Sequence, residues 1–452
     1  MFRISKIQVD MGTESTGKAL LKLAIPSVLS MFFHTLFHLI DTIFVSWLGE
    51  ISLAAMSLSF PLLFVIFAVV NGMAVGTTTC ATRELGANNT AKAQTFANAA
   101  LLLILGLSLL PIPLLTPDLS NKFYFILGGK GAVLPECYAY SFWMILGAPL
   151  MGLALLGESL FRSQGDTFTP MMSMLIGNLL NILLDPILIF GLKWGIAGAS
   201  IATFIGRIVS LAYLAYKLKK KARLRPTLRF DKSFPKYWKD ISIVGFPVAL
   251  SQTSMAIGAA LMNKILSLFG PAAISAWMLG NRIEMFAFLP VFGLNSGLIP
   301  FLSYNIGKGN FQKVKEAVML ASKAAVVLML SIGLLLFSFP QVFLLPFSPT
   351  PQMASMAIDS VRASATGYIF AAIDITLWGL FQGSGYAYFG MISQLARTLL
   401  FRAPLGYLMG IYFGIKILWW CQPISALGSL LLSLLFAKKV LNLIQGNINS
   451  KA

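Results

Sequence analysis

Three side chains capable of proton or metal chemistry lie close together in the first apolar stretch of the sequence, residues 24–48. His34, His38 and Asp41 are spaced i, i+4 and i+7, which places all three on one face of a helix. An aspartate in the middle of a membrane span costs roughly 2.5–3.5 kcal/mol to insert, and such residues usually serve a function. We therefore interpret this face as part of a functional site.

A second polar stripe lies in the apolar stretch 168–190. Asn178, Asn181 and Asp185 are spaced i, i+3 and i+7, again on one helical face. A carboxyl group in a low-dielectric cavity can exchange a proton near neutral pH. Carboxylate, amide and hydroxyl oxygens, including the Thr203 hydroxyl, would together suit Na⁺. The residues are compatible with either ion, and the simpler alternative for Asp185 is a hydrogen bond to a neighbouring helix.

The two histidines are the only ones in the chain, and they allow three interpretations. His34 and His38 have the spacing of two zinc ligands on a helix, but Thr35 stands where the zinc-protease motif requires glutamate. Protease chemistry is therefore not indicated. Helix packing, a substrate contact or proton relay shared with Asn178, and metal binding are all compatible with the pair.

The composition predicts the elements that position these side chains. Hydrophobic residues make up 57% of the 452 positions and charged residues 11%, whereas soluble domains carry about 25% charged residues. The mean hydropathy is +0.80. Apolar stretches long enough to cross a bilayer as helices recur from end to end. The twelve stretches are residues 24–48, 54–79, 96–116, 135–160, 168–190, 196–216, 241–269, 274–301, 317–345, 359–381, 388–412 and 417–437.

The net charge of +18 is distributed in a way that predicts membrane orientation rather than nucleic-acid binding. Lysine and arginine gather in the tails and in the even-numbered loops between the predicted helices. By the positive-inside rule, both termini are expected in the cytoplasm. We expect a multi-pass protein of the plasma membrane, which is the inner membrane in a Gram-negative cell, with residues 217–240 as a basic cytoplasmic linker.

The sequence repeats itself at an offset of 221 residues. Matched pairs include Pro26 with Pro247, Gly72 with Gly293, and Gly76 with Gly297. We therefore predict an all-α integral membrane protein with twelve transmembrane helices in two six-helix pseudo-symmetric lobes. The N-lobe would span residues 1–216 and the C-lobe residues 241–452. Transporters built from such repeats place their sites near mid-membrane, at or within the repeats.

The polar stripes are not repeated in the second copy. At this offset the positions equivalent to His34, His38 and Asp41 hold Met255, Ala259 and Met262. Later in the repeat the offset becomes 220, as in the match of Phe161 with Phe381, and the positions equivalent to Asn178, Asn181 and Asp185 hold Thr398, Phe401 and Leu405. Two other acids enter predicted spans of the C-lobe. Glu284 has Arg282 nearby as a simple ion-pair partner, whereas Asp374 has no charge close in sequence and is expected to face a cavity.

Several longer motifs give the chain a family resemblance. They are Ile25-Pro26-Ser27, Asp41-Thr42 leading to Trp47-Leu48-Gly49, Arg162-Ser163-Gln164-Gly165-Asp166-Thr167, Asn181-Ile182-Leu183-Leu184-Asp185-Pro186 and Gly195-Ile196-Ala197-Gly198-Ala199-Ser200-Ile201-Ala202-Thr203. Over nearly its whole length the chain resembles the multidrug and toxic compound extrusion (MATE) transporters, in particular the branch related to DNA-damage-inducible and archaeal members. The resemblance implies efflux of small amphipathic, often cationic compounds in exchange for H⁺ or Na⁺.

The resemblance also implies roles for particular residues. Asp41, Asn181, Asp185 and Thr203 match the cation or proton site of the N-lobe in that branch, where Na⁺ would be the metal ion bound. Pro26 matches the proline at which the first helix is thought to bend.

A C-lobe ion site is a further implication of the resemblance. Glu284 and Asp374 match the ion site of a branch typified by sodium-driven bacterial members. Phe370 stands where that branch has a tyrosine, so this second site departs from the pattern.

Other functions fit the sequence less well. A lipid or lipid-linked oligosaccharide flippase of the same broad superfamily is the alternative, but the N-lobe residues here are acidic. The Gly-x-Gly-Asp signature of intramembrane aspartyl proteases is absent, and no phosphate-binding loop is present. We therefore expect a protein that is not an enzyme, has no cofactor besides the coupling ion, contacts membrane lipids and functions as a monomer.

Overall fold

A computed structural model describes residues 8–228, 230–347 and 350–449, and every regular element within these ranges is helical. The α-helices are α1 (Thr16–Ser46), α2 (Glu50–Gly86), α3 (Thr90–Leu109), α4 (Pro117–Ile126), α5 (Val133–Leu146), α6 (Ala148–Ser163), α7 (Phe168–Pro186), α8 (Gly195–Lys221), α9 (Phe234–Leu266), α10 (Pro271–Gly307), α11 (Phe311–Ser338), α12 (Pro340–Leu344), α13 (Pro351–Thr366), α14 (Tyr368–Ser384), α15 (Ala387–Leu395), α16 (Ala403–Phe413), α17 (Ile415–Leu418) and α18 (Cys421–Asn449). Two π-helical segments extend this set: η2 (Ile187–Gly191) continues α7, and η5 (Ala396–Arg402) joins α15 to α16.

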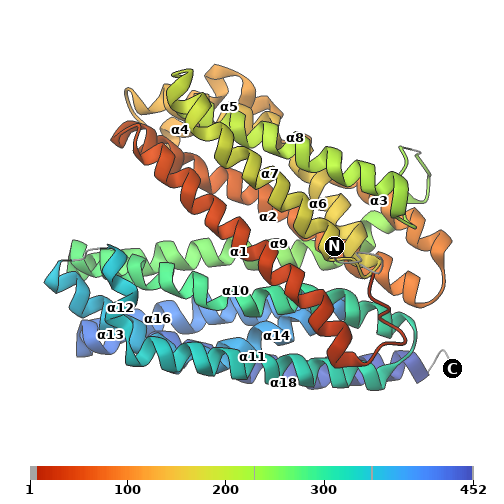
Figure 1. The fold of residues 1–452 in the computed structure, drawn as a ribbon. Helices are drawn as coiled ribbons and strands as arrows, with labels where there is room; N and C mark the ends of the chain where they lie inside the picture. The colour runs from red at the N-terminus through yellow and green to blue at the C-terminus, as the bar shows by residue number, and fades with distance from the viewer. Residues whose placement is uncertain (1–7, 229, 348–349, 450–452) are drawn as a thin grey trace, which may run out of the picture. The chain divides into compact units, whose positions relative to one another are not determined.

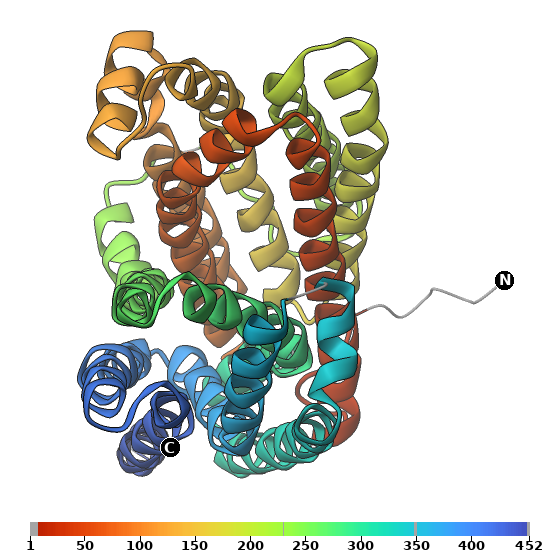
Figure 2. The same ribbon diagram turned by 90° about the vertical axis from the view of Figure 1, so that its left-hand side faces the viewer.

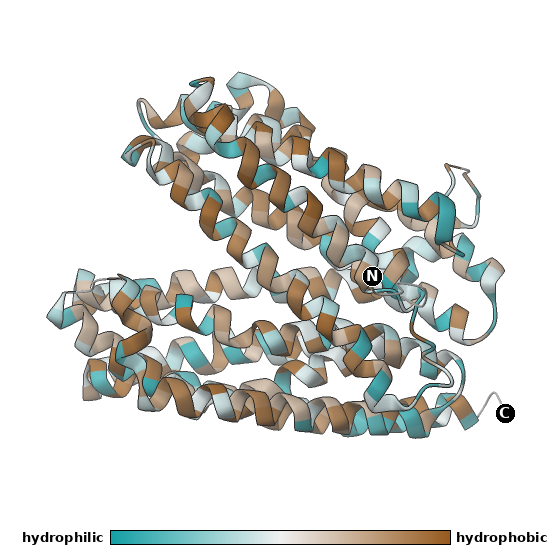
Figure 3. Cartoon of the chain, viewed as in Figure 1, coloured by the Kyte–Doolittle hydropathy of each residue, from teal (hydrophilic) through white to brown (hydrophobic). Residues whose placement is uncertain are grey.

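The helices correspond to the predicted apolar stretches. Within the described ranges, nine helices are long and apolar enough to cross a membrane, and two bent pairs, α5 with α6 and α13 with α14, pass the same test together. The remaining predicted stretch, 388–412, is the continuous helical segment formed by α15, η5 and α16. Hydrophobic residues run along the length of the helices (Figure 3). The predicted fold class, an all-α membrane protein with two helical lobes, is confirmed.

Two of the predicted spans are bent rather than straight. The helix axis turns by 42° between α5 and α6 and by 56° between α13 and α14. The bends lie at Gly147 and Gly367, which are 220 residues apart and therefore equivalent in the two repeats. A Cβ at Gly147 would lie 3.1 Å from the Phe204 side chain, and one at Gly367 would lie 2.6 Å from Pro423 Cα. Glycine therefore leaves room for a neighbouring helix at each bend.

The described chain forms two compact units. Unit 1 contains the described residues up to Asp10 and Leu29–Ala249, and unit 2 contains Met11–Val28 and the described residues from Leu250 onward. The first part of α1 thus belongs to unit 2, and the first part of α9 belongs to unit 1 (Figures 1 and 2). Each boundary falls two residues after a proline inside the helix, Pro26 in α1 and Pro247 in α9. The compact units and the sequence repeats are therefore different divisions of the chain.

Repeated glycines explain how the first part of α9 packs in unit 1 and how the first part of α1 packs in unit 2. In unit 1, a Cβ on Gly72 of α2 would collide with the carbonyl oxygen of Gly245 in α9. In unit 2, a Cβ on Gly293 of α10 would collide with Val28 in α1. Small residues allow helix backbones to approach closely in membranes. Since Gly72 and Gly293 are equivalent in the repeat, both units use the same close helix crossing.

Candidate functional site

A close contact between α7 and α8 positions the polar residues of unit 1. A Cβ on Gly206 of α8 would lie 2.7 Å from the carbonyl oxygen of Gly177 in α7, so the two backbones nearly touch. Asn181 lies one turn after Gly177, and its Nδ2 donates to Thr203 Oγ1 at 3.1 Å. Thr203 Oγ1 in turn donates to the Ala199 carbonyl at 3.1 Å. The structure therefore joins two of the four predicted coupling residues.

The other two predicted coupling residues, Asp41 and Asp185, form what we call the acidic pair. Asp41 in α1 is 4% exposed, and Asp185 near the end of α7 is fully buried. The two carboxyl groups lie within electrostatic range of each other. Tyr140 of α5, which is also buried, is within range of both. The acidic pair thus lies inside unit 1, where α1 and α7 supply the two acids and α5 supplies Tyr140.

Four oxygen atoms of these residues are buried with no hydrogen-bond donor among the described residues. They are Asp41 Oδ1, Asn181 Oδ1, and both Oδ1 and Oδ2 of Asp185. A buried acceptor without a partner costs about 1–3 kcal/mol, and more when it is charged. All four atoms are acceptors, so a proton or a hard cation such as Na⁺ would satisfy those that it reaches. The residues present therefore fit a small cation.

The two histidines face each other one turn apart on α1. His34 Nε2 and His38 Nε2 are 3.3 Å apart, and the rings meet edge to face at 75°. Neutral imidazole has one donor and one acceptor nitrogen, so one ring can donate to the other. Among the described residues, no group of three or more His, Cys, Asp or Glu side chains could hold a metal ion together. Asn178 of α7 has a buried Nδ2 with no partner in the same ranges.

Two residues of this region were missed in the sequence analysis. Arg207 of α8 lies within electrostatic range of His34, His38 and Tyr140. A sequence signal for Arg207 exists, because it follows Thr203 by four residues within one apolar stretch and so shares its helical face. No comparable signal marks Tyr140, whose position depends on how α5 packs.

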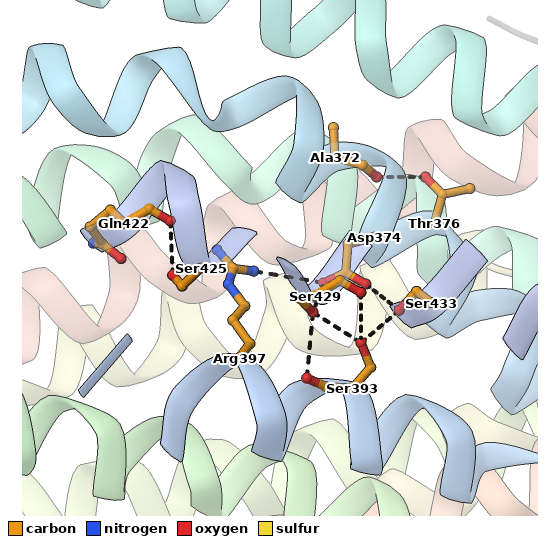
Figure 4. A network of polar contacts seen from close by, with 9 residues as sticks. All are labelled: Ala372, Asp374, Thr376, Ser393, Arg397, Gln422, Ser425, Ser429 and Ser433. Atoms are coloured by element: carbon orange, nitrogen blue, oxygen red, sulfur yellow. Dashed lines mark hydrogen bonds and ion pairs between the residues drawn. The ribbon is translucent and has the colours of Figure 1, made fainter. Parts of the chain in front are cut away.

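Asp374 of unit 2 has a complete set of partners (Figure 4). Its carboxylate accepts hydrogen bonds from Ser429 Oγ at 2.7 Å and Ser433 Oγ at 2.6 Å, both on α18. Arg397 Nη1 of η5 lies 4.0 Å from Asp374 Oδ2. Ser393 of α15 also bonds to both serines. We call these five residues the serine network; it satisfies and neutralises a fully buried acid.

Glu284, the other predicted acid of unit 2, borders a small polar cavity. The cavity has a volume of about 20 Å³ and is lined in part by Tyr368, Arg397 and Gln422, which is room for about one water molecule. The charged neighbours of Glu284 are Arg397 and Arg402. Its sequence neighbour Arg282 forms no ion pair with it in the described part of the chain. Both C-lobe acids therefore lie beside arginine.

Pro26, the predicted hinge, is an interior residue of α1. Proline removes one backbone hydrogen bond and disturbs the preceding turn, which weakens a helix locally. Val28, two residues later, is the last residue of this segment of unit 2. The helix is therefore weakest close to the point where it passes from one compact unit to the other.

The repeated helices and the buried polar side chains define a multi-pass membrane protein of the transporter class. The MatE family model matches residues 26–187 and again residues 247–408, so the two matches lie 221 residues apart, as the repeat does. The chain belongs to this family, the MATE transporters. The family resemblance proposed from sequence motifs is thus confirmed, and it places the chain among transporters.

Individual relatives agree with this placement. A protein named FAD transporter from Shewanella oneidensis is 30% identical over 91% of this chain and 92% of its own length. A probable multidrug resistance protein, NorM, from Thermotoga maritima is 27% identical over 89% of this chain and 87% of its own. The outward-facing structure of a multidrug resistance MATE transporter superposes with a TM-score of 0.92, at 27% identity, over 97% of this chain and 99% of the other.

Proposed function

We propose that this protein is a secondary active efflux antiporter that exports small amphipathic compounds in exchange for H⁺ or Na⁺. The observation that carries the proposal is the set of four buried acceptor oxygens on Asp41, Asn181 and Asp185 that have no donor among the described residues. A site of this kind is costly when empty and is satisfied by a cation. Binding and release of a cation at one place is the requirement of an ion-coupled transporter.

The coupling ion would act on both the site and the first helix. A proton or Na⁺ entering from outside would neutralise the acidic pair and favour bending of α1 near Pro26, which would release the substrate outward. Return to the other state would release the ion to the cytoplasm. Each elementary charge that moves inward supplies about 2.3 kcal/mol per 100 mV of membrane potential. One or two ions per cycle would therefore support strong accumulation of substrate outside.

The relatives support small-molecule transport, since their names describe a probable multidrug resistance protein and a FAD transporter. We place the protein in the plasma membrane with both termini in the cytoplasm, because lysine and arginine gather in the tails and in the linker 217–240. One chain contains both repeats and the acidic pair, so a monomer surrounded by lipid is sufficient for the cycle.

Reconstitution tests the proposal. Purified protein in liposomes is given a pH gradient or a Na⁺ gradient separately, and uphill movement of ethidium is followed by fluorescence, with protein-free liposomes as the control. Transport driven by one gradient supports antiport and identifies the ion. Folded protein that moves ethidium under neither gradient would contradict the proposal, and lipid scrambling would then be measured as the signature of a flippase.

A further inference from the structure

Arg207 is a cationic side chain within a membrane-spanning helix, and it has no carboxylate partner in the described part of the chain. Its one side-chain hydrogen bond there runs from Nη1 to the Met144 carbonyl at 3.4 Å, and no acid lies within ion-pair distance. Guanidinium carries five N–H donors, so most of them are not used by protein acceptors. Ionisable groups inside a membrane almost always pair with another charge or face an aqueous cavity.

The helices bring three further polar residues to the same end of unit 1. Gly177 faces Gly206 across the antiparallel pair α7 and α8, so Asn178 and Arg207, one residue further along each helix, project to the same side. The buried Asn178 Nδ2 has no acceptor among the described residues.

The histidines of α1 complete this group. His34 and His38 both lie within electrostatic range of Arg207. Because one neutral imidazole donates its N–H to Nε2 of the other, the accepting ring keeps its Nδ1–H for a further acceptor. We call His34, His38, Asn178 and Arg207 the donor cluster.

His38 lies one turn before Asp41, and the other members of the donor cluster lie farther from the acidic pair along the helices. His34 precedes Asp41 by seven residues on α1, which corresponds to about 10 Å of helix. Arg207 follows Thr203 by four residues on α8, or about 6 Å. The region therefore has an acceptor end at Asp41 and Asp185 and a donor end at Arg207, a distance apart that one drug-sized molecule can span.

We infer that the donor cluster binds an anionic group, a carboxylate or a phosphate, of the exported substrate. The planar guanidinium fork of Arg207 matches the paired oxygens of such groups, and charge-assisted hydrogen bonds of this kind are stronger than those between neutral groups. The inference rests on the proposed efflux function and adds compounds that carry an acid to its substrate class. The equivalent positions in the second repeat hold no cation: Met255, Ala259 and Thr398 match His34, His38 and Asn178, and Leu427 matches Arg207, so the subsite belongs to the N-lobe alone.

Equilibrium binding to the purified full-length protein tests this without any gradient. For phosphate, FMN is compared with riboflavin by fluorescence anisotropy, since the two differ by one phosphate. For carboxylate, rhodamine 110 is compared with its methyl ester, rhodamine 123. Wild-type protein is expected to bind at least one acid about tenfold more tightly than its uncharged or esterified partner. Preference in one arm alone identifies which acidic group the subsite takes.

Three variants connect any preference to the donor cluster. Arg207→Met should remove the preference while leaving riboflavin and rhodamine 123 within about twofold of wild type. Arg207→Lys should keep part of the preference, because lysine retains the positive charge but lacks the planar guanidinium group that binds two oxygens at once. The control is Arg362→Met, since Arg362 likewise gives one bond to a carbonyl, from Nε to Phe337 O at 3.2 Å, but lies on α13 in unit 2. It should leave the preference unchanged.

The outcomes separate this inference from the efflux proposal. The inference would be overturned by equal binding within both pairs of dyes, by no binding of either acid, or by an equal loss of affinity for all four dyes in Arg207→Met. The last result would mean that Arg207 only caps α5 through the Met144 carbonyl. Arg207-dependent preference in protein that shows no gradient-driven transport would support the subsite and contradict the antiport. Thermal unfolding of each variant confirms that it is folded.

Discussion

The acidic pair of unit 1 and Asp374 of unit 2 are buried carboxyl groups on repeats of one scaffold, but they have opposite surroundings. Asp374 accepts two serine hydrogen bonds and lies beside Arg397. Among the described residues, Asp185 has two buried oxygens with no donor, and Asp41 has one. The scaffold is held in common through equivalent glycines and prolines, whereas the polar interior has diverged. One unit carries a satisfied network, and the other carries buried acceptors with no donor among the described residues.

The largest expected effect concerns what the two units share. Gly72→Leu and Gly293→Leu should each destabilise the protein by roughly 3–5 kcal/mol, at the upper end for single substitutions, because each side chain would collide with a neighbouring helix. Unfolding temperature and recovery from size-exclusion chromatography measure this. Gly106 has no atom within 4 Å of a Cβ, so Gly106→Leu is the control. Strongly unequal losses at Gly72 and Gly293 would contradict equivalent packing.

The second prediction concerns the serine network. Asp374→Leu should cost roughly 3–5 kcal/mol of stability, because it removes the acid within ion-pair distance of the buried Arg397 and leaves only the more distant Glu284. The double variant Asp374→Leu with Arg397→Met should recover part of that loss, since the unpaired charge is gone. Chemical denaturation of the single and double variants provides the coupling energy. Strictly additive losses would show that the two residues do not interact.

The third prediction concerns the acidic pair, which should govern ligand-dependent rather than intrinsic stability. Saturation with the coupling ion at about 100 times its Kd should stabilise wild type by about 2.7 kcal/mol. Asp185→Asn should fold as well as wild type and lose this response, because an amide neither takes up a proton nor carries the negative charge that attracts Na⁺. The unfolding temperature is recorded against Na⁺ concentration and against pH. An unchanged ion response in Asp185→Asn would separate Asp185 from the site.

The smallest expected effect is at the start of α7. Asp166 accepts hydrogen bonds from the backbone N–H and the hydroxyl of Thr169 at 2.9 and 2.6 Å, whereas its counterpart Tyr386 gives α15 no side-chain cap. Asp166→Ala should cost about 1 kcal/mol, and Tyr386→Phe less than about 0.5 kcal/mol. Thermal unfolding distinguishes them, and equal losses would remove this difference between the units.

Much of the fold could be predicted from the sequence because membrane insertion imposes a simple rule on composition. Each span needs about 20 apolar residues, so the stretches were visible as runs, and the repeat was visible as matched prolines and glycines. The bends at Gly147 and Gly367 were not predicted, because a glycine in an apolar run is also common in straight membrane helices. The neighbours that make glycine necessary at these bends, Phe204 and Pro423, lie far away in the sequence.

The polar interior was predictable only in part. Helical spacing grouped His34, His38 and Asp41 on α1, and it grouped Asn178, Asn181 and Asp185 on α7, because side chains three and four residues apart share a face. The serine network could not be anticipated, since Ser393 and Ser429 come from different helices and serine is common in membrane spans. Arg207 was overlooked, although its spacing from Thr203 placed it on the same face. The roles assigned to these residues remain predictions.

The most direct test of the central claim compares Asp41→Asn with Asp374→Asn in the same reconstituted assay. Both substitutions replace a buried acid by its amide, and the amide introduced in unit 2 would still offer an acceptor to the serines of α18. Ethidium efflux is measured under the gradient that drives wild type, with folded protein of each variant at equal density. The account predicts that Asp374→Asn retains gradient-driven efflux and that Asp41→Asn loses it. Driven efflux by Asp41→Asn at the wild-type rate would contradict the assignment of coupling to unit 1.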